Sequence, residues 1–318
     1  MTEPLRTLAL PPLGSLPLSR ADSDRDGDSR IVENVLDGLW DSADTKVLPL
    51  VQGRAPVVGT ALRLVSPADV ERPELLVYLG RVNEGATDAG QRVVLAVLET
   101  EDAALAPGGQ WLGLREIAAS LDARDAGLFV EAAAVANWHA THTHCPRCGT
   151  RTEVRDAGWV RQCPRDGSQH YPRTDAAIIV SVIDDDDRLM LGSAVAWPED
   201  RFSTLAGFVE PGESLEAAVI REVGEESGIE IQSPQYLGSQ PWPFPASLML
   251  GFTARAVTVD AVPDLEEIRS LRWFTREQLF AEVRDEKIAV AGGVSIARAL
   301  IERWYGGPLD EEPSEARS

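Results

Sequence analysis

The chain has 318 residues, of which 44% are hydrophobic and 25% charged, an ordinary composition for a globular protein of about two domains. Its formal net charge of −21 would repel phosphate backbones, so we exclude nonspecific nucleic-acid binding. That charge fits a protein that collects divalent cations, and it equally fits solubility alone. The N-terminal segment lacks a basic start and no run approaches the ~20 apolar residues of a membrane span, so we expect no signal peptide, no membrane contact and a cytoplasmic location.

The first part of the chain predicts an α+β domain over residues 1–138. Residues 19–30 are polar and predict a loop. A helix is expected within residues 113–142, where apolar residues recur at helical spacing. Between these segments, turn residues separate four short β-rich runs that predict a sheet, at 45–51, 61–66, 75–82 and 91–99.

The last part of the chain, residues 174–318, predicts strands and helices that alternate. Residues 175–193 read as strand, acidic turn and strand, and a helix is expected soon after Gly207. Further strands are expected within 247–259 and 268–275, and a final helix within 295–305.

Residues 207–231 carry the pattern with the clearest chemical meaning. Ser214 can cap a helix N-terminus, and Gly228 stands where a helix would end. Near that end, Glu222, Glu225 and Glu226 follow the spacing i, i+3 and i+4, which places three carboxylates on one helical face. Like charges at this density repel each other, and a hard cation such as Mg²⁺ or Mn²⁺ would relieve the repulsion. An acidic helix face that is merely solvated is the alternative for these three residues taken alone.

The same segment matches the longer pattern G-x5-E-x7-R-E-U-x-E-E-x-G-U, in which U is an aliphatic residue. The defined positions are filled by Gly207, Glu213, Arg221, Glu222, Val223, Glu225, Glu226, Gly228 and Ile229. The segment therefore resembles the box of the Nudix hydrolases. This resemblance implies an αβα sandwich for the C-terminal domain.

The resemblance also implies roles for individual residues. Glu222 and Glu226 would be metal ligands, and Glu225 either a ligand or the base that activates water. Arg221 would orient the first carboxylate and brace the loop by pairing with Glu213. Two further ligands are implied outside the box: the carbonyl of Ala206, and Glu267, for which Glu266 is a competing choice.

A proline-rich aromatic segment follows about ten residues beyond the box, within ordinary loop length. Because proline locks φ and cannot donate a hydrogen bond to a sheet, we expect a stiff, extended segment that is neither helix nor central strand. Flat aromatic rings on such a backbone suit flat ligand rings, whereas a loop that only packs on the core is the alternative. The segment resembles the array of the NADH pyrophosphatase subfamily, which implies substrate contacts by Gln240, Pro241, Trp242, Pro243, Phe244, Pro245, Ala246 and Ser247, and also by Tyr171 and the backbone of Ala297.

The three cysteines lie in one window and predict a zinc-ribbon-like module over residues 139–173. Cys145 and Cys148 form a knuckle, and Cys163 begins a second one. The subfamily has a fourth cysteine where this chain has Asp166. A site of three cysteines and Asp166 is one reading, with His170 or His144 as substitutes for the fourth ligand; loss of the metal is the other. The zinc would be structural.

Together, the resemblance implies a degenerate Nudix-like N-terminal domain, the zinc module and a catalytic Nudix domain in a homodimer. The implied enzyme is an NAD(H) diphosphatase that cleaves NAD(H) to NMN(H) and AMP, and also removes NAD caps from RNA 5′ ends. The alternatives are another dinucleotide or ADP-ribose as substrate, a non-catalytic nucleotide sensor, and a nucleic-acid-binding zinc ribbon, against which the acidic composition speaks.

Overall fold

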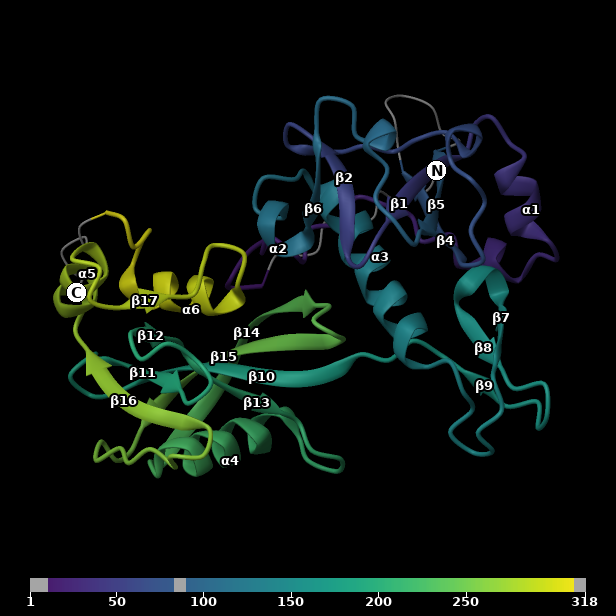
Figure 1. Ribbon diagram of the computed structural model, residues 1–318. Helices are drawn as coiled ribbons and strands as arrows, with labels where there is room; N and C mark the ends of the chain where they lie inside the picture. Colours follow the sequence, from purple (N-terminus) through teal and green to yellow (C-terminus); the bar gives the residue numbers. More distant parts are fainter. Residues whose placement is uncertain (1–10, 83–89, 312–318) are drawn as a thin grey trace, which may run out of the picture. The chain divides into compact units, whose positions relative to one another are not determined.

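The computed structural model describes residues 11–82 and 90–311, which fall into two units (Figure 1). Unit 1 comprises Met1–Pro17, Asp175–Gln240 and Leu248–Ser318, and unit 2 comprises Leu18–Thr174 and Pro241–Ser247. The described residues before Leu18 thus lie in unit 1, whereas the predicted domain 1–138 counted them with the N-terminal domain. In the described residues, no helix combines the length and the apolar character that crossing a bilayer requires.

Unit 1 is built on a six-stranded sheet. Its strands follow the order β14-β15-β10-β11-β16, and β13 also pairs with β10. The elements are β10 (Asp175–Ile183), β11 (Leu189–Ala194), β12 (Arg201–Phe202), β13 (Leu205–Phe208), α4 (Leu215–Ser227), β14 (Ile231–Trp242), β15 (Ser247–Ala256), β16 (Ile268–Phe274), α5 (Arg276–Arg284), β17 (Ala289–Val290) and α6 (Ile296–Tyr305).

Alternation along β10 shows how the sheet is covered on both faces. Ile178 and Val180 pack in one buried cluster with Val219 of α4. Ile179, which points to the other face, packs in a second cluster with Leu300 of α6. Helices therefore cover both faces of the sheet, which confirms the αβα sandwich.

Unit 2 contains two three-stranded sheets, β1-β5-β4 and β3-β2-β6, and a small third sheet, β7-β8-β9. The helix predicted over 113–142 is present as two pieces, because Asp122 caps a new helix at Asp125 N. The elements are η1 (Gly27–Ile31), α1 (Val35–Trp40), β1 (Lys46–Leu50), β2 (Arg54–Val58), β3 (Ala61–Leu62), η2 (Pro67–Asp69), β4 (Leu76–Val82), β5 (Gln91–Val97), η3 (Ala103–Leu105), β6 (Gln110–Gly113), α2 (Leu114–Ile117), α3 (Ala123–Thr141), β7 (Glu153–Arg155), η4 (Asp156–Gly158), β8 (Val160–Gln162) and β9 (Gln169–His170).

The segment 19–30, expected to be a loop, is tied to the sheet of unit 2. Asp24 forms an antiparallel bridge with Arg81. The carboxylate of Asp26 accepts hydrogen bonds from the Tyr78 hydroxyl at 2.7 Å and from Arg81 Nε at 2.8 Å. Its polar residues thus serve as anchors to β4, which the low hydrophobicity of the segment does not reveal.

Candidate active site and metal centre

Helix α4 begins and ends where the box sequence predicts. The Ser214 hydroxyl accepts the N–H of Ala217 at 3.2 Å, and this bond caps the N-terminus. Gly228 ends the helix with φ = 67°, in the left-handed region that favours glycine. The helix therefore carries the carboxylates of the box between two fixed ends.

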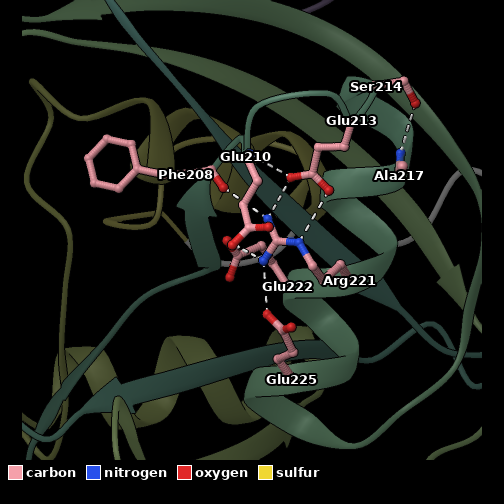
Figure 2. Close-up of polar contacts among 8 residues, drawn as sticks. All are labelled: Phe208, Glu210, Glu213, Ser214, Ala217, Arg221, Glu222 and Glu225. Carbon is pink, nitrogen blue, oxygen red and sulfur yellow. Dashed lines mark hydrogen bonds and ion pairs between the residues drawn. The ribbon is translucent and has the colours of Figure 1, made fainter.

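Arg221 joins the loop before α4 to the helix (Figure 2). Its guanidinium donates to both carboxylate oxygens of Glu213, at 2.6 and 3.2 Å, and to the carbonyl of Phe208 at 2.9 Å. The predicted pairing of Arg221 with Glu213 is thus confirmed. Arg221 is the largest cause that lowers the pKa of Glu213, so the pair stays ionised and the loop stays anchored.

The same guanidinium reaches two carboxylates of the predicted metal site. Arg221 Nη1 lies 2.8 Å from Glu225 Oε2 and 3.0 Å from Glu222 Oε1. The Glu225 side chain is 61% exposed, whereas that of Glu222 is 12% exposed. These contacts, and first among them the hydrogen bonds to Glu213, raise the pKa of Arg221. Arg221 therefore fixes where both carboxylates lie.

The glycine at the start of the box is required by Glu222. A Cβ at Gly207 would lie 2.0 Å from the Glu222 carboxyl carbon. The carboxylate therefore packs directly against the end of β13, where Ala206 pairs with Ile179 of β10. Burial raises the pKa of Glu222, and Arg221 opposes that effect.

Glu226 is the carboxylate with the least compensated charge. It is 5% exposed, and its Oε2 has no hydrogen-bond partner among the described residues. Burial first, and then Glu222, Glu267, Asp264 and Glu225, raise its pKa to about 8. A cation among these oxygens would remove the repulsion, so the residues fit a hard divalent ion.

Two of these neighbours come from the loop before β16. Glu267 raises the pKa of both Glu222 and Glu226, and Glu266 is not among the causes, which favours Glu267 as the acidic partner. Asp264 was not predicted. Its carboxylate accepts the N–H groups of Glu267 at 3.2 Å and of Ile268 at 2.8 Å, and so shapes the turn that presents Glu267. An aspartate that opens a loop is the sequence signal for such a turn.

The carboxylates do not converge as closely as the cysteine cluster does. Among residues 11–82 and 90–311, only one group of three or more ligand side chains has its ligand atoms within 4.8 Å of one another, and that group contains the cysteines. Glu225 is held by Arg221, whose Nη1 donates to its Oε2. The structure thus gathers the predicted acidic ligands into one region without closing them around a single point.

The proline-rich segment differs from the expected extended loop. Pro241 and Trp242 are the last residues of β14, residues 243–246 form a turn, and Ser247 begins β15. The expectation that the segment is neither helix nor central strand is confirmed, because β14 is an edge strand, where proline is tolerated. The expected extended backbone ends at Trp242, where the turn follows. The segment is therefore the tip of a hairpin. The rings of Trp242 and Phe244 meet edge to face, 5.1 Å between centroids.

The other predicted substrate residues lie in varied surroundings. Gln240 is fully buried, its amide nitrogen donates to the carbonyl of Val294 at 2.9 Å, and its Oε1 has no hydrogen-bond partner among the described residues. Ser247 is 9% exposed and the Ala297 side chain is buried, with its N–H bonded to Ser295 Oγ at 3.2 Å. Tyr171 is exposed, and its hydroxyl donates to Gln169.

The cysteine module contains two turns of the same design. In the first, Gly149 N–H bonds to the carbonyl of Cys145 at 2.9 Å; in the second, Gly167 N–H bonds to that of Cys163 at 2.9 Å. Both glycines adopt a positive φ, 73° and 72°. Asp166 therefore occupies in the second turn the position that Cys148 occupies in the first.

The four side chains of this module fit a tetrahedral metal site. One ligand atom each from Cys145, Cys148, Cys163 and Asp166 lies within 4.8 Å of the other three, and this group includes neither His144 nor His170. Hydrogen bonds from Ser168 are the main cause that lowers the pKa of Asp166. A hydrogen bond with Ser168 is also the main cause that lowers the pKa of Cys145, to about 6. Burial raises the pKa of Cys163 to about 11, which a bound cation would reverse.

Comparison with known proteins agrees with this geometry. Family models match as follows: the NUDIX domain at residues 172–291, the NADH pyrophosphatase zinc ribbon domain at 140–171 and the NADH pyrophosphatase-like rudimentary NUDIX domain at 29–138. The chain is 36% identical over 312 residues to the "NAD-capped RNA hydrolase NudC" of Mycobacterium bovis, covering 92% of this chain and 96% of that protein.

A human relative, "NAD-capped RNA hydrolase NUDT12", is 39% identical over 196 residues, which are 58% of this chain and 42% of that protein. A solved NUDIX hydrolase from Nitrosomonas europaea superposes with a TM-score of 0.43 and 20% identity, covering 52% of this chain and 94% of that one. Because the Mycobacterium relative is matched over nearly its whole length, the chain belongs to the Nudix hydrolase family, in the group that carries the NADH pyrophosphatase zinc ribbon and rudimentary Nudix domains.

Proposed function

We propose that this protein hydrolyses the diphosphate of NAD(H) to NMN(H) and AMP, and that it removes NAD caps from RNA 5′ ends. The observation that carries the proposal is Glu226, a buried carboxylate with an unpartnered oxygen that lies among four further acids in a complete box and the loop before β16. The NAD specificity is supported by the Gln240–Ser247 segment and by the names of the relatives.

In this proposal, the divalent ions are Mg²⁺ or Mn²⁺, held by Glu222, Glu226, Glu267 and the Ala206 carbonyl. When bound, they would polarise the diphosphate and lower the pKa of the attacking water. Glu225, the most exposed of the four box glutamates, would accept the proton of that water at its carboxylate or serve as a further ligand. Arg221 orients Glu222 and Glu225, and Glu213 anchors Arg221.

The hairpin tip with Trp242 and Phe244, together with Tyr171 and the backbone of Ala297, would contact the dinucleotide. Zinc would be bound by the three cysteines and Asp166 and would be structural. The domains would be 1–138, 139–173 and 174–318, in a cytoplasmic homodimer.

The experiment compares turnover of NADH, NAD⁺, ADP-ribose, diadenosine polyphosphates and 5′-NAD-capped RNA. RNA with a 5′ triphosphate is the control. We expect Mg²⁺- or Mn²⁺-dependent release of AMP from NADH, and cap removal only from the NAD-capped RNA. If NADH is the poorest substrate, the proposed specificity is wrong. If no substrate is cleaved but nucleotides bind, the protein is a sensor.

A further inference from the structure

The hairpin tip Pro241–Ser247 groups with unit 2, although the strands that flank it belong mostly to unit 1. Two side chains of unit 2 contact the tip. Asn137, on α3, donates through its amide nitrogen to the carbonyls of Pro243 at 2.8 Å and Pro245 at 3.3 Å. Arg115, on α2, lies with its guanidinium carbon 4.0 Å from the centroid of the Phe244 ring.

The bonds from Asn137 match what a proline-rich tip lacks. Proline has no N–H, so a hairpin tip with three prolines has few donors of its own for the carbonyls of Pro243 and Pro245. A side-chain amide carries two N–H groups on one nitrogen and can serve both carbonyls. Asn137 thus fixes the backbone on both sides of Phe244.

Arg115 fixes the two rings rather than the backbone. Its guanidinium carbon lies 5.2 Å from the Trp242 ring centroid in addition to its contact with Phe244. Arg115 makes no ion pair with any carboxylate among the described residues, so its cation is directed at the ring faces and not at an acid. One cation over both rings holds them in their edge-to-face arrangement.

We propose that Asn137 and Arg115 are positioning residues for the substrate-binding tip, and that they set selectivity for dinucleotides that carry a nicotinamide ring. The inference rests on the proposed function and deepens it. A tip that is ordered before substrate arrives loses less conformational freedom on binding, so the contribution appears in affinity for the ring-bearing substrate. The rudimentary N-terminal domain thereby contributes to specificity without supplying a group that touches the diphosphate.

The decisive variants are Asn137→Asp and Arg115→Met. The first keeps the shape of the side chain but faces two carbonyl oxygens with carboxylate oxygens, and the second keeps the length but removes the cation. We expect KM for NADH to rise about tenfold in each, with kcat within about twofold. ADP-ribose lacks the nicotinamide ring. Its KM as a substrate, or its Ki as a competitive inhibitor, should change less than about twofold. Arg115→Lys, which keeps a cation, should restore part of the loss.

A second readout needs no turnover. Hydrogen exchange of peptides that span residues 240–250 in the ligand-free protein should speed up in Asn137→Asp and Arg115→Met, with exchange elsewhere unchanged. The matched control is Arg72→Met, which removes a cation that lies 5.9 Å from the Trp40 ring centroid in the same unit and that pairs with Asp37. It should behave as wild type in all three measurements.

Equal changes in the constants for NADH and ADP-ribose, no change in either, or unaltered exchange at the tip would each overturn the positioning role. Failure of the wild type to cleave NADH would instead overturn the proposed function, while the exchange measurement still reports whether Asn137 and Arg115 order the tip.

Discussion

Two buried glutamates, Glu226 on α4 and Glu131 on α3, look alike until their neighbours are compared. They are 5% and 3% exposed, both have carboxylate oxygens without hydrogen-bond partners among the described residues, and burial is the largest cause that raises each pKa, to about 8 and about 7. Glu131 lies 3.2 Å from Arg25 Nη1 and 3.8 Å from Arg30 Nη2. Glu226 has acids as neighbours instead.

The difference teaches that a buried carboxylate with a raised pKa does not by itself mark a site. Around Glu131 two arginines partly compensate the charge within the fold, which indicates a structural role. Around Glu226 each charged neighbour adds to the repulsion, and relief must come from outside the chain. The sign of the surrounding charge separates the two cases.

The largest expected effect is a difference in enzymatic activity between variants of Glu226 and Glu131. Glu226→Gln keeps the side-chain shape but removes the ligand charge, so we expect metal-dependent AMP release from NADH to fall at least about 100-fold. Glu131→Gln, the matched control, should stay within about twofold when both are assayed well below their melting temperatures. Similar losses in both variants would mean that burial, and not the acidic surroundings, makes Glu226 important.

Substitution of Arg221, in the same site as Glu226, should have a smaller effect on activity. Arg221→Lys keeps the positive charge but cannot make the forked contacts to Glu213 while also reaching Glu225. We expect kcat to fall about 10–100-fold, as for other residues that orient metal ligands. Activity unchanged from wild type would show that charge alone suffices and that the forked geometry is dispensable.

The cysteine module differs from the acidic site around Glu226, because its four candidate metal ligands already lie close together. Asp166→Ala should lower zinc affinity at least about tenfold, and Asp166→Cys should raise it, because thiolates are softer ligands for zinc. Competition with a chromophoric chelator measures both. Glu153→Ala, an exposed change on the neighbouring strand β7, is the control. Equal zinc affinity in Asp166→Ala and wild type would remove Asp166 from the ligand set.

The smallest expected effect concerns the pH dependence of stability at Glu131. Its pKa in the fold, about 7, is above its ordinary value of 4.5, so its protonated form is the one that the fold favours. The resulting stability is complete below pH 4.5 and is lost as pH rises through 7. The melting temperature of Glu131→Gln minus that of wild type should therefore increase across this window and then level off. A constant difference would contradict the raised pKa.

The sequence pattern predicted the local part of the site well. The cap at Ser214, the end at Gly228 and the pairing of Arg221 with Glu213 all depend on residues within one loop and one helix, where spacing determines contact. The sandwich was implied by the resemblance of the box to the Nudix hydrolases.

The rest depends on contacts between residues far apart in the chain, which spacing does not encode. Asp264, in the loop before β16, is one of the acids that raise the pKa of Glu226. Gln240 is buried because the end of β14 packs near Val294. The tip of the hairpin is a turn rather than an extended loop, and Asn137, more than a hundred residues earlier, supplies its hydrogen bonds. Each of these contacts is seen only in the folded structure.

The proposal that outside cations neutralise the acids around Glu226 can be tested by calorimetric titration of the zinc-loaded protein with Mn²⁺ at pH 7.5. The wild type and Glu131→Gln should bind Mn²⁺ alike, and the double variant Glu222→Gln, Glu226→Gln should bind it at least about tenfold more weakly. Superimposable isotherms for the wild type and the double variant would show that these carboxylates do not hold the ion.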